Sequence, residues 1–114
     1  MKKNLITYLA LMFFTCEAFA IGSIAFNPKN GKSGMSWNAK SIEEAQNLAL
    51  QSCGYGSCKI LMDYQKTCAA LAANPGYGYG WSKGGNLNTV KIDALNECRQ
   101  AGNDNCSVVI SHCE

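Results

Sequence analysis

Two copies of one motif of about 45 residues make up most of this 114-residue chain, and the duplication constrains the fold more than any other feature. The landmarks recur in one order: an apolar segment ending in Asn-Pro, a Gly-x-x-Trp stretch, an Ala-Leu pair and three cysteines. Cys53, Cys58 and Cys68 are followed 45 to 48 residues later by Cys98, Cys106 and Cys113. Because ordered landmarks seldom coincide by chance, we interpret residues 21–66 and 67–114 as tandem copies within a single domain.

The first twenty residues have the pattern of a signal peptide. Lys2 and Lys3 precede an apolar run over residues 5–14, and Ala18-Phe19-Ala20 places small residues before a cleavage site. The apolar run is shorter than the ~20 residues that a membrane span needs. We therefore predict export, cleavage after residue 20, and a mature chain from Ile21 onward that does not associate with a membrane. An uncleaved membrane anchor is the alternative.

Cleavage would remove Cys16 and leave six of the seven cysteines. An even number of cysteines in a short exported chain is typical of a disulfide framework. Spacing alone permits about fifteen pairings, but duplicated units favour equivalent bonds. The predicted pairs are Cys53–Cys58, Cys98–Cys106 and Cys68–Cys113, the last of them between the copies. No Cys-x-x-Cys spacing occurs, so we predict neither a metal site nor a cofactor.

Each copy has the pattern strand, turn, strand, helix, strand. The strands are expected over residues 23–26, 32–37 and 59–64 in the first copy, and over 68–73, 77–81 and 107–111 in the second. The helices are expected to begin at Ser41, with Glu44 completing a capping box, and near Asn88. Their inward faces are expected to carry Ala45, Leu48, Ala49 and Cys53, and Val90, Ala94, Leu95 and Cys98. The pattern predicts an α+β fold of two β-β-α-β repeats with pseudo-twofold symmetry, in which two helices pack on antiparallel sheet. The strand order stays open.

Several short motifs extend over the mature chain. They are S-x-A-F-x-P at residues 23–28, G-x-S-W at 34–37, A-x-x-x-A-L-x-x-C-G at 45–54, G-Y-G-W-S at 78–82 and C-x-V-V-I-x-x-C at 106–113. In these motifs the chain resembles a family of small exported bacterial proteins, the domain of unknown function DUF4189. The resemblance implies export and a common fold, and it supplies no catalytic residues.

Residues with catalytic chemistry are few. His112 is the only histidine, and its place beside Cys113 favours a packing or surface role over a role in a nucleophile pair. Glu43 and Glu44 are adjacent, whereas glycosidase carboxylates face each other at ~5–9 Å. They lie in the first turn of the helix, where their negative charges interact favourably with the partial positive charge of the helix N-terminus. We therefore predict no catalytic residues and no enzyme activity.

The aromatic residues are the most informative about binding. Tyr77, Tyr79 and Trp81 would share one face of a strand at residues 77–81. Trp37 is the counterpart of Trp81 in the alignment of the copies, so the tryptophans are expected to belong to the fold. Tyr77 and Tyr79 have no such counterpart in the first copy, and Tyr55 is a further aromatic residue between glycines. Rigid aromatics are common in protein-binding hot spots, so we take Tyr55, Tyr77 and Tyr79 as partner-binding candidates. The alternative is that they complete the core.

These observations favour one functional hypothesis over two others. Without the leader, eight Lys and Arg residues stand against seven Asp and Glu residues, which gives no electrostatic basis for binding nucleic acid. The leading hypothesis is a periplasmic or secreted protein-binding module, in concrete form an inhibitor or immunity-type protein that blocks a toxin, a cell-wall hydrolase or a host protein. The alternatives are a secreted effector or enzyme of unrecognised type that uses His112, and a structural envelope protein. The identity of the partner and the oligomeric state stay open.

Overall fold

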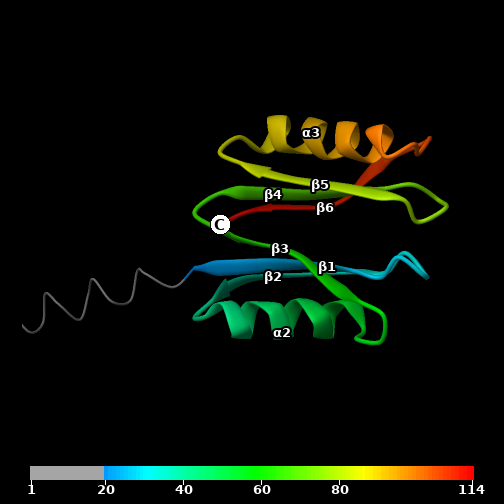
Figure 1. Ribbon diagram of the computed structural model, residues 1–114. Helices are drawn as coiled ribbons and strands as arrows, with labels where there is room; N and C mark the ends of the chain where they lie inside the picture. Colours follow the sequence, from blue (N-terminus) through cyan, green and yellow to red (C-terminus); the bar gives the residue numbers. More distant parts are fainter. Residues whose placement is uncertain (1–19) are drawn as a thin grey trace, which may run out of the picture.

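The computed structural model describes residues 20–114, which form two copies of a β-β-α-β unit (Figure 1). The first unit comprises β1 (Ile21–Phe26), β2 (Ser33–Ala39), α2 (Ile42–Cys53) and β3 (Lys59–Gln65). The second comprises β4 (Cys68–Ala73), β5 (Tyr79–Gly84), α3 (Leu87–Gln100) and β6 (Ser107–Cys113). The predicted duplication and fold class are confirmed, whereas the predicted signal peptide and Cys16 lie outside the described residues. Neither of these two helices is long and apolar enough to cross a membrane.

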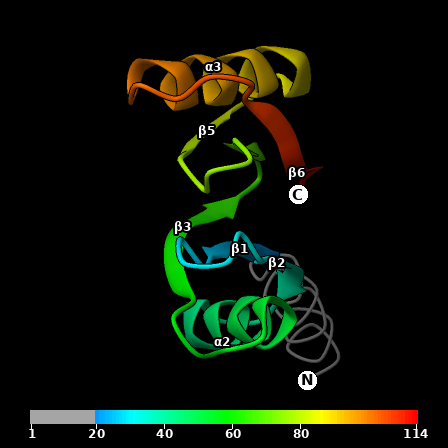
Figure 2. The same ribbon diagram turned by 90° about the vertical axis from the view of Figure 1, so that its right-hand side faces the viewer.

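Each unit builds its own three-stranded antiparallel sheet with its first strand in the centre. The orders are β2-β1-β3 and β5-β4-β6. The two sheets face each other, and α2 and α3 cover their outer faces (Figure 1), so the molecule has four layers (Figure 2). The strand order, which the sequence left open, is therefore the same in both units.

The two central strands divide their side chains between two cores. In β1, Ile24 and Phe26 point toward the other sheet, where they meet Leu71 of β4. Ala25, which alternates with them, points toward α2 and packs against Ala49 and Cys53. This follows from the two-residue period of a strand. All six residues of β4 are buried, because one face of that strand contacts the other sheet and the opposite face contacts α3.

Small residues let each helix lie directly on the second strand of its sheet. A Cβ atom at Gly34 would overlap the backbone of Cys53 in α2, and one at Gly80 would overlap the backbone of Cys98 in α3. The sheet register agrees, since Gly34 lies opposite Ala25 and Gly80 lies opposite the equivalent alanine of β4. Gly34 therefore corresponds to Gly80, and the alignment of the copies by their Gly-x-x-Trp stretches was two residues out of register.

This register overturns the interpretation of the two tryptophans. Met35 lies opposite Ile24, and Trp81 lies opposite the equivalent Leu71, so Trp81 corresponds to Met35 and not to Trp37. Trp37 is also 55 % exposed, and Trp81 is 38 % exposed. The predicted equivalence of the two tryptophans is therefore wrong, because Gly78 and Gly80 offered two alignments that only the helix contact distinguishes.

The helix boundaries follow the predicted capping pattern with small changes. The Ser41 hydroxyl accepts a hydrogen bond from the backbone N–H of Glu44 at 3.0 Å. The Glu44 carboxylate accepts from the N–H of Lys40 at 3.2 Å, one residue before the predicted partner. α3 begins one residue earlier than predicted, because Asn86 is its N-cap. Leu48, predicted to face inward, is exposed, because α2 contacts its sheet along a narrow stripe of small residues.

Residues 20–114 contain three disulfide bonds, and these join the predicted pairs. They are Cys53–Cys58, Cys68–Cys113 and Cys98–Cys106. The sequence predicted that the Cys68–Cys113 bond joins the two copies, but it lies within the second unit. Cys68 begins β4 and lies opposite Cys113 of the neighbouring β6. All three bonds therefore lie within a unit, and the two units contact each other through packing and hydrogen bonds.

Candidate functional site

Four loops gather at one end of the molecule, which we call the turn end. They comprise residues 27–32, 54–58, 74–78 and 101–106. All four appear at the right in Figure 1, because each unit returns the chain to this end after its first strand and again after its helix. Binding residues often lie on loops that a rigid scaffold positions, so this end is the first place to look for a site.

Two of the three disulfide bonds close loops at the turn end. Cys53–Cys58 spans residues 54–58, and Cys98–Cys106 spans residues 101–106. Within the first loop, Tyr55 donates its backbone N–H to Leu50 at 2.9 Å, and the Tyr55 carbonyl accepts from Cys58 at 3.0 Å. Loops fixed in this way lose little conformational entropy when they bind a partner.

Tyr55 and Tyr77 are both exposed at the turn end, and both adopt an uncommon backbone conformation. Tyr55 is 57 % exposed with φ of 57°, and Tyr77 is 42 % exposed with φ of 69°. The left-handed region suits glycine and asparagine, and it costs other residues ~1–2 kcal/mol. Folding alone would favour glycine or asparagine at these two positions. The tyrosines are therefore held there at some expense of stability.

Tyr77 lies in the turn before β5, although the sequence predicted that it belongs to the strand. Its backbone N–H donates to the carbonyl of Asn74 at 2.9 Å and closes that turn. The Tyr77 ring lies on Gly31 of the first unit, where a Cβ atom would overlap the ring. Tyr77 thus joins loops from both units and borders a shallow hollow of about 270 Å³.

Tyr79 has a different environment from the other two tyrosines. It is half-buried in β5, and its ring lies 4.8 Å from that of Phe26, between the two sheets. The Lys59 ammonium is 5.3 Å from the centre of the Tyr79 ring. The structure therefore places Tyr79 mainly in the core, and Tyr55 and Tyr77 are the binding candidates that present most surface.

His112 lies at the opposite end of the molecule, in contact with the first unit. Its Nδ1 is 3.3 Å from the Tyr64 hydroxyl, which is 2.9 Å from the carbonyl oxygen of Ser36. A carbonyl can only accept, so the single hydroxyl proton goes to Ser36, and His112 donates Nδ1–H to the tyrosine oxygen. The Trp37 ring stacks on His112 with ring centres 5.0 Å apart.

The Tyr64 hydroxyl is held in its neutral form. Burial raises its pKa well above the ordinary value, and the nearby Glu114 carboxylate raises it further. That carboxylate accepts a hydrogen bond from the backbone N–H of Asn38 at 2.9 Å. A tyrosine that keeps its proton does not activate His112 as a base would, and these contacts fit the packing role expected of His112.

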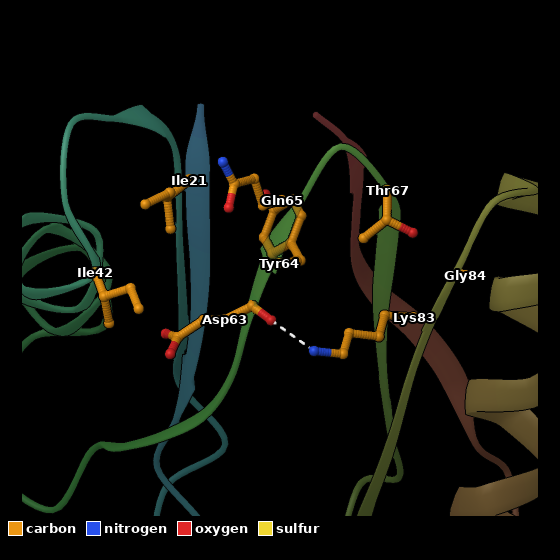
Figure 3. Close-up of a pocket in the computed structure, with 8 residues that line it drawn as sticks. All are labelled: Ile21, Ile42, Asp63, Tyr64, Gln65, Thr67, Lys83 and Gly84. Atoms are coloured by element: carbon orange, nitrogen blue, oxygen red, sulfur yellow. Dashed lines mark hydrogen bonds between the residues drawn. The ribbon is translucent and has the colours of Figure 1, made fainter. Parts of the chain in front are cut away.

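A second hollow, of about 430 Å³, lies between the units on the side of β3 and β5 (Figure 3). Its lining residues are Ile21, Ile42, Asp63, Tyr64, Gln65, Thr67, Lys83 and Gly84. The Lys83 ammonium donates to the carbonyl oxygen of Asp63 at 2.9 Å, across the gap between the sheets. The Asp63 carboxylate accepts from Gln46 and Ser23, each at 3.1 Å. The charged groups are thus committed to contacts within the protein. Sequence reasoning missed this hollow because its walls come from different copies.

The fold and these surfaces define a small, internally duplicated α+β domain, stabilised by disulfide bonds, with a rigid loop surface at one end. The chain belongs to the family described as a domain of unknown function, DUF4189, whose sequence model matches residues 21–113. The predicted family resemblance is therefore confirmed. Three disulfide bonds in so small a domain are consistent with an extracytoplasmic protein.

Relatives occur in Mycobacterium tuberculosis. Protein Rv1269c is 38 % identical over 74 residues, which cover 65 % of this chain and 57 % of the relative. Uncharacterized protein Rv1813c is 33 % identical over 75 residues, which cover 66 % of this chain and 50 % of the relative. The chain thus spans about half the length of these curated relatives. The NMR structure of Rv1813c superimposes with a TM-score of 0.64 at 28 % identity, covering 84 % of this chain and 76 % of that one.

Proposed function

We propose that this protein is an exported recognition module that binds a protein partner through its turn end and acts by contact. The observation that carries the proposal is the state of Tyr55 and Tyr77, two exposed aromatics held in left-handed backbone conformations on disulfide-closed or tightly packed loops. Strained residues cluster at functional sites, where the surrounding structure compensates for their cost.

The chemistry of these tyrosines fits a protein interface. A tyrosine offers a large amphipathic surface with only two side-chain torsions, so ordering it on binding costs little entropy. Tyrosine is also enriched among the few interface residues that dominate affinity. The Cys53–Cys58 bond restrains the backbone of the loop that carries Tyr55, and the contact with Gly31 restrains the Tyr77 ring.

The concrete form of the proposal is an inhibitor or immunity-type protein of the periplasm or the exterior. Protease–inhibitor complexes bury only about 1,600 Å² yet are among the tightest, since rigid loops enter a preformed cleft with little loss of entropy. A small domain whose loops gather at one end has this architecture. A toxin or a cell-wall hydrolase, whose cleft such loops would block, is the expected class of target.

Affinity capture with the mature oxidised protein tests this proposal. The bait is compared with Tyr55→Ala and Tyr77→Ala, and with Ile92→Ala as a matched control, because Ile92 is an exposed apolar residue of α3. We expect both tyrosine variants to bind the captured, purified partner at least tenfold more weakly, and the control to bind within twofold of wild type. Capture of no partner, or equal binding by all three variants, would overturn the proposal.

A further inference from the structure

The hollow beside Tyr77 is lined entirely by uncharged residues. They are Asn30, Gly31, Ala73, Asn74, Pro75, Tyr77, Asn105, Ser107 and Val109. Its volume of about 270 Å³ lies just below the ~300–1,000 Å³ of pockets for drug-sized ligands, so it suits one or two small rings. An anionic or cationic ligand would meet no opposite charge in this lining.

The polar groups of this hollow retain capacity for hydrogen bonding. Asn30 uses its side-chain oxygen to accept from the backbone N–H of Lys32 at 2.9 Å, which leaves its amide donors available. Among residues 20–114, Asn105 has no partner for its side-chain amide, and both it and Ser107 are exposed at the rim. A carboxamide both donates and accepts, and so does a hydroxyl group, so this set matches a ligand with several hydroxyl groups.

The main apolar surface of the hollow is the Tyr77 ring, whose orientation is fixed by a neighbouring residue. The Tyr77 ring rests on Gly31, where no side chain of another residue type would fit, and this contact fixes its direction. Val109, 47 % exposed, adds a small apolar surface next to it. An aromatic ring held in this way offers a surface on which C–H groups of a saturated ring can stack.

We propose that this hollow binds a neutral carbohydrate ring. The C–H face of such a ring stacks on Tyr77, and its hydroxyl groups bond to the amides of Asn30 and Asn105 and to the hydroxyl of Ser107. The absence of charge in the lining selects neutral sugars over uronic acids and amino sugars. This site shares Tyr77 with the proposed protein interface, whereas Tyr55 lines a different hollow on α2 and belongs to the protein interface alone.

The test is a titration of the isotope-labelled, oxidised mature protein, followed by two-dimensional NMR. The neutral probes are N-acetylglucosamine and cellobiose, and the charged comparisons are glucuronic acid and glucosamine. We expect saturable shifts for a neutral probe, confined to residues 30–31, 73–77 and 105–109, and smaller, non-saturating shifts for the charged sugars. No saturable shift up to the solubility limit, or the same response to all four sugars, would overturn the proposal.

A pair of matched variants identifies the site. Asn105 and Asn38 are both exposed and both have φ of 59°, a conformation that glycine adopts without strain, but only Asn105 borders the hollow. Asn105→Gly should weaken binding of the neutral sugar at least tenfold, whereas Asn38→Gly should leave it within twofold of wild type. An equal effect of the two variants would contradict the assignment. Tyr55→Ala, which should disrupt protein capture, should leave sugar binding unchanged.

Discussion

Tyr64 and His112 occupy equivalent positions in the two units, and their side chains meet between the sheets with Tyr64 Oη 3.3 Å from His112 Nδ1. Tyr64 lies opposite Gly22, the second residue of β1, and His112 lies opposite Ala69, the second residue of β4. The third strands of both units are also irregular at the same step of the ladder. The pseudo-twofold axis therefore passes close to this pair, at which the two copies carry different side chains.

Removing the Tyr64 hydroxyl should destabilise the fold. Tyr64→Phe leaves the ring in place but deprives the carbonyl of Ser36 and the Nδ1–H of His112 of their partner. Since a buried group without its hydrogen bond costs ~1–3 kcal/mol, we expect the free energy of unfolding to fall by about that amount. Urea denaturation measures the change. Tyr55→Phe, at an exposed site, serves as the control, and equal stability of the two variants would contradict the bonding scheme.

Stability should decline at alkaline pH because of the same residue. The pKa of Tyr64 is raised in the folded state by burial and by Glu114, so the folded state binds the hydroxyl proton more tightly than the unfolded state. The stabilisation is complete below the unfolded value of about pH 10 and is lost as the pH rises toward the folded value. Denaturation curves from pH 8 upward test this sign. The decline should be shallower in Tyr64→Phe, and parallel curves for the two proteins would refute the linkage.

The close contact between α3 and β5 should make Gly80 intolerant of a side chain. In Gly80→Ala the new Cβ would overlap the backbone of Cys98 and Glu97, so helix and sheet must separate. Overpacking of this kind typically costs ~1–3 kcal/mol. Thermal denaturation should show a lower midpoint than for Gly85→Ala, the control, because a Cβ at Gly85 meets nothing within 4 Å. A Gly80→Ala protein as stable as this control would show that the contact is looser.

Replacing Tyr55 by glycine should weaken binding without destabilising the fold. Tyr55→Gly relieves a left-handed backbone and removes a mostly exposed ring, so we expect stability to stay the same or to rise by up to ~1 kcal/mol. Binding of the captured partner should fall at least tenfold. Chemical denaturation and calorimetric titration measure the two effects. Strong destabilisation would instead support the alternative hypothesis, in which the tyrosine ring completes the core.

The mature protein should begin at Ile21. The small residues at positions 18 and 20 predict cleavage at this point, and β1 begins at Ile21, so the expected site directly precedes the first strand. Mass spectrometry of protein recovered from the periplasm or the medium determines the N-terminus. Replacing Ala20 by a bulky residue should leave an uncleaved form, and cleavage elsewhere would show that the leader is assigned incorrectly.

The sequence by itself determined the local elements and the pairing of the cysteines. Strand alternation, the Ser41 cap and the spacing of alanines on the helices are local signals, because each depends on residues within a turn or two. The duplication added a long-range constraint, since equivalent units close equivalent bonds. That constraint led to Cys53–Cys58 and Cys98–Cys106, and it left Cys68 to pair with Cys113.

Only the tertiary structure decided how the copies fit together. The periodicity of β4 is consistent with burial on both faces but does not say which partner covers each face, so the face-to-face sheets were not predictable. The choice between Gly78 and Gly80 as the counterpart of Gly34 depends on a helix contact that no local pattern records. Tyr77 meets Gly31, and Tyr64 meets His112, across 46 and 48 residues of sequence respectively. Such pairs form only when both sheets are in place, because each pair joins residues of different units. Short-range sequence patterns carry no information about how two complete units pack.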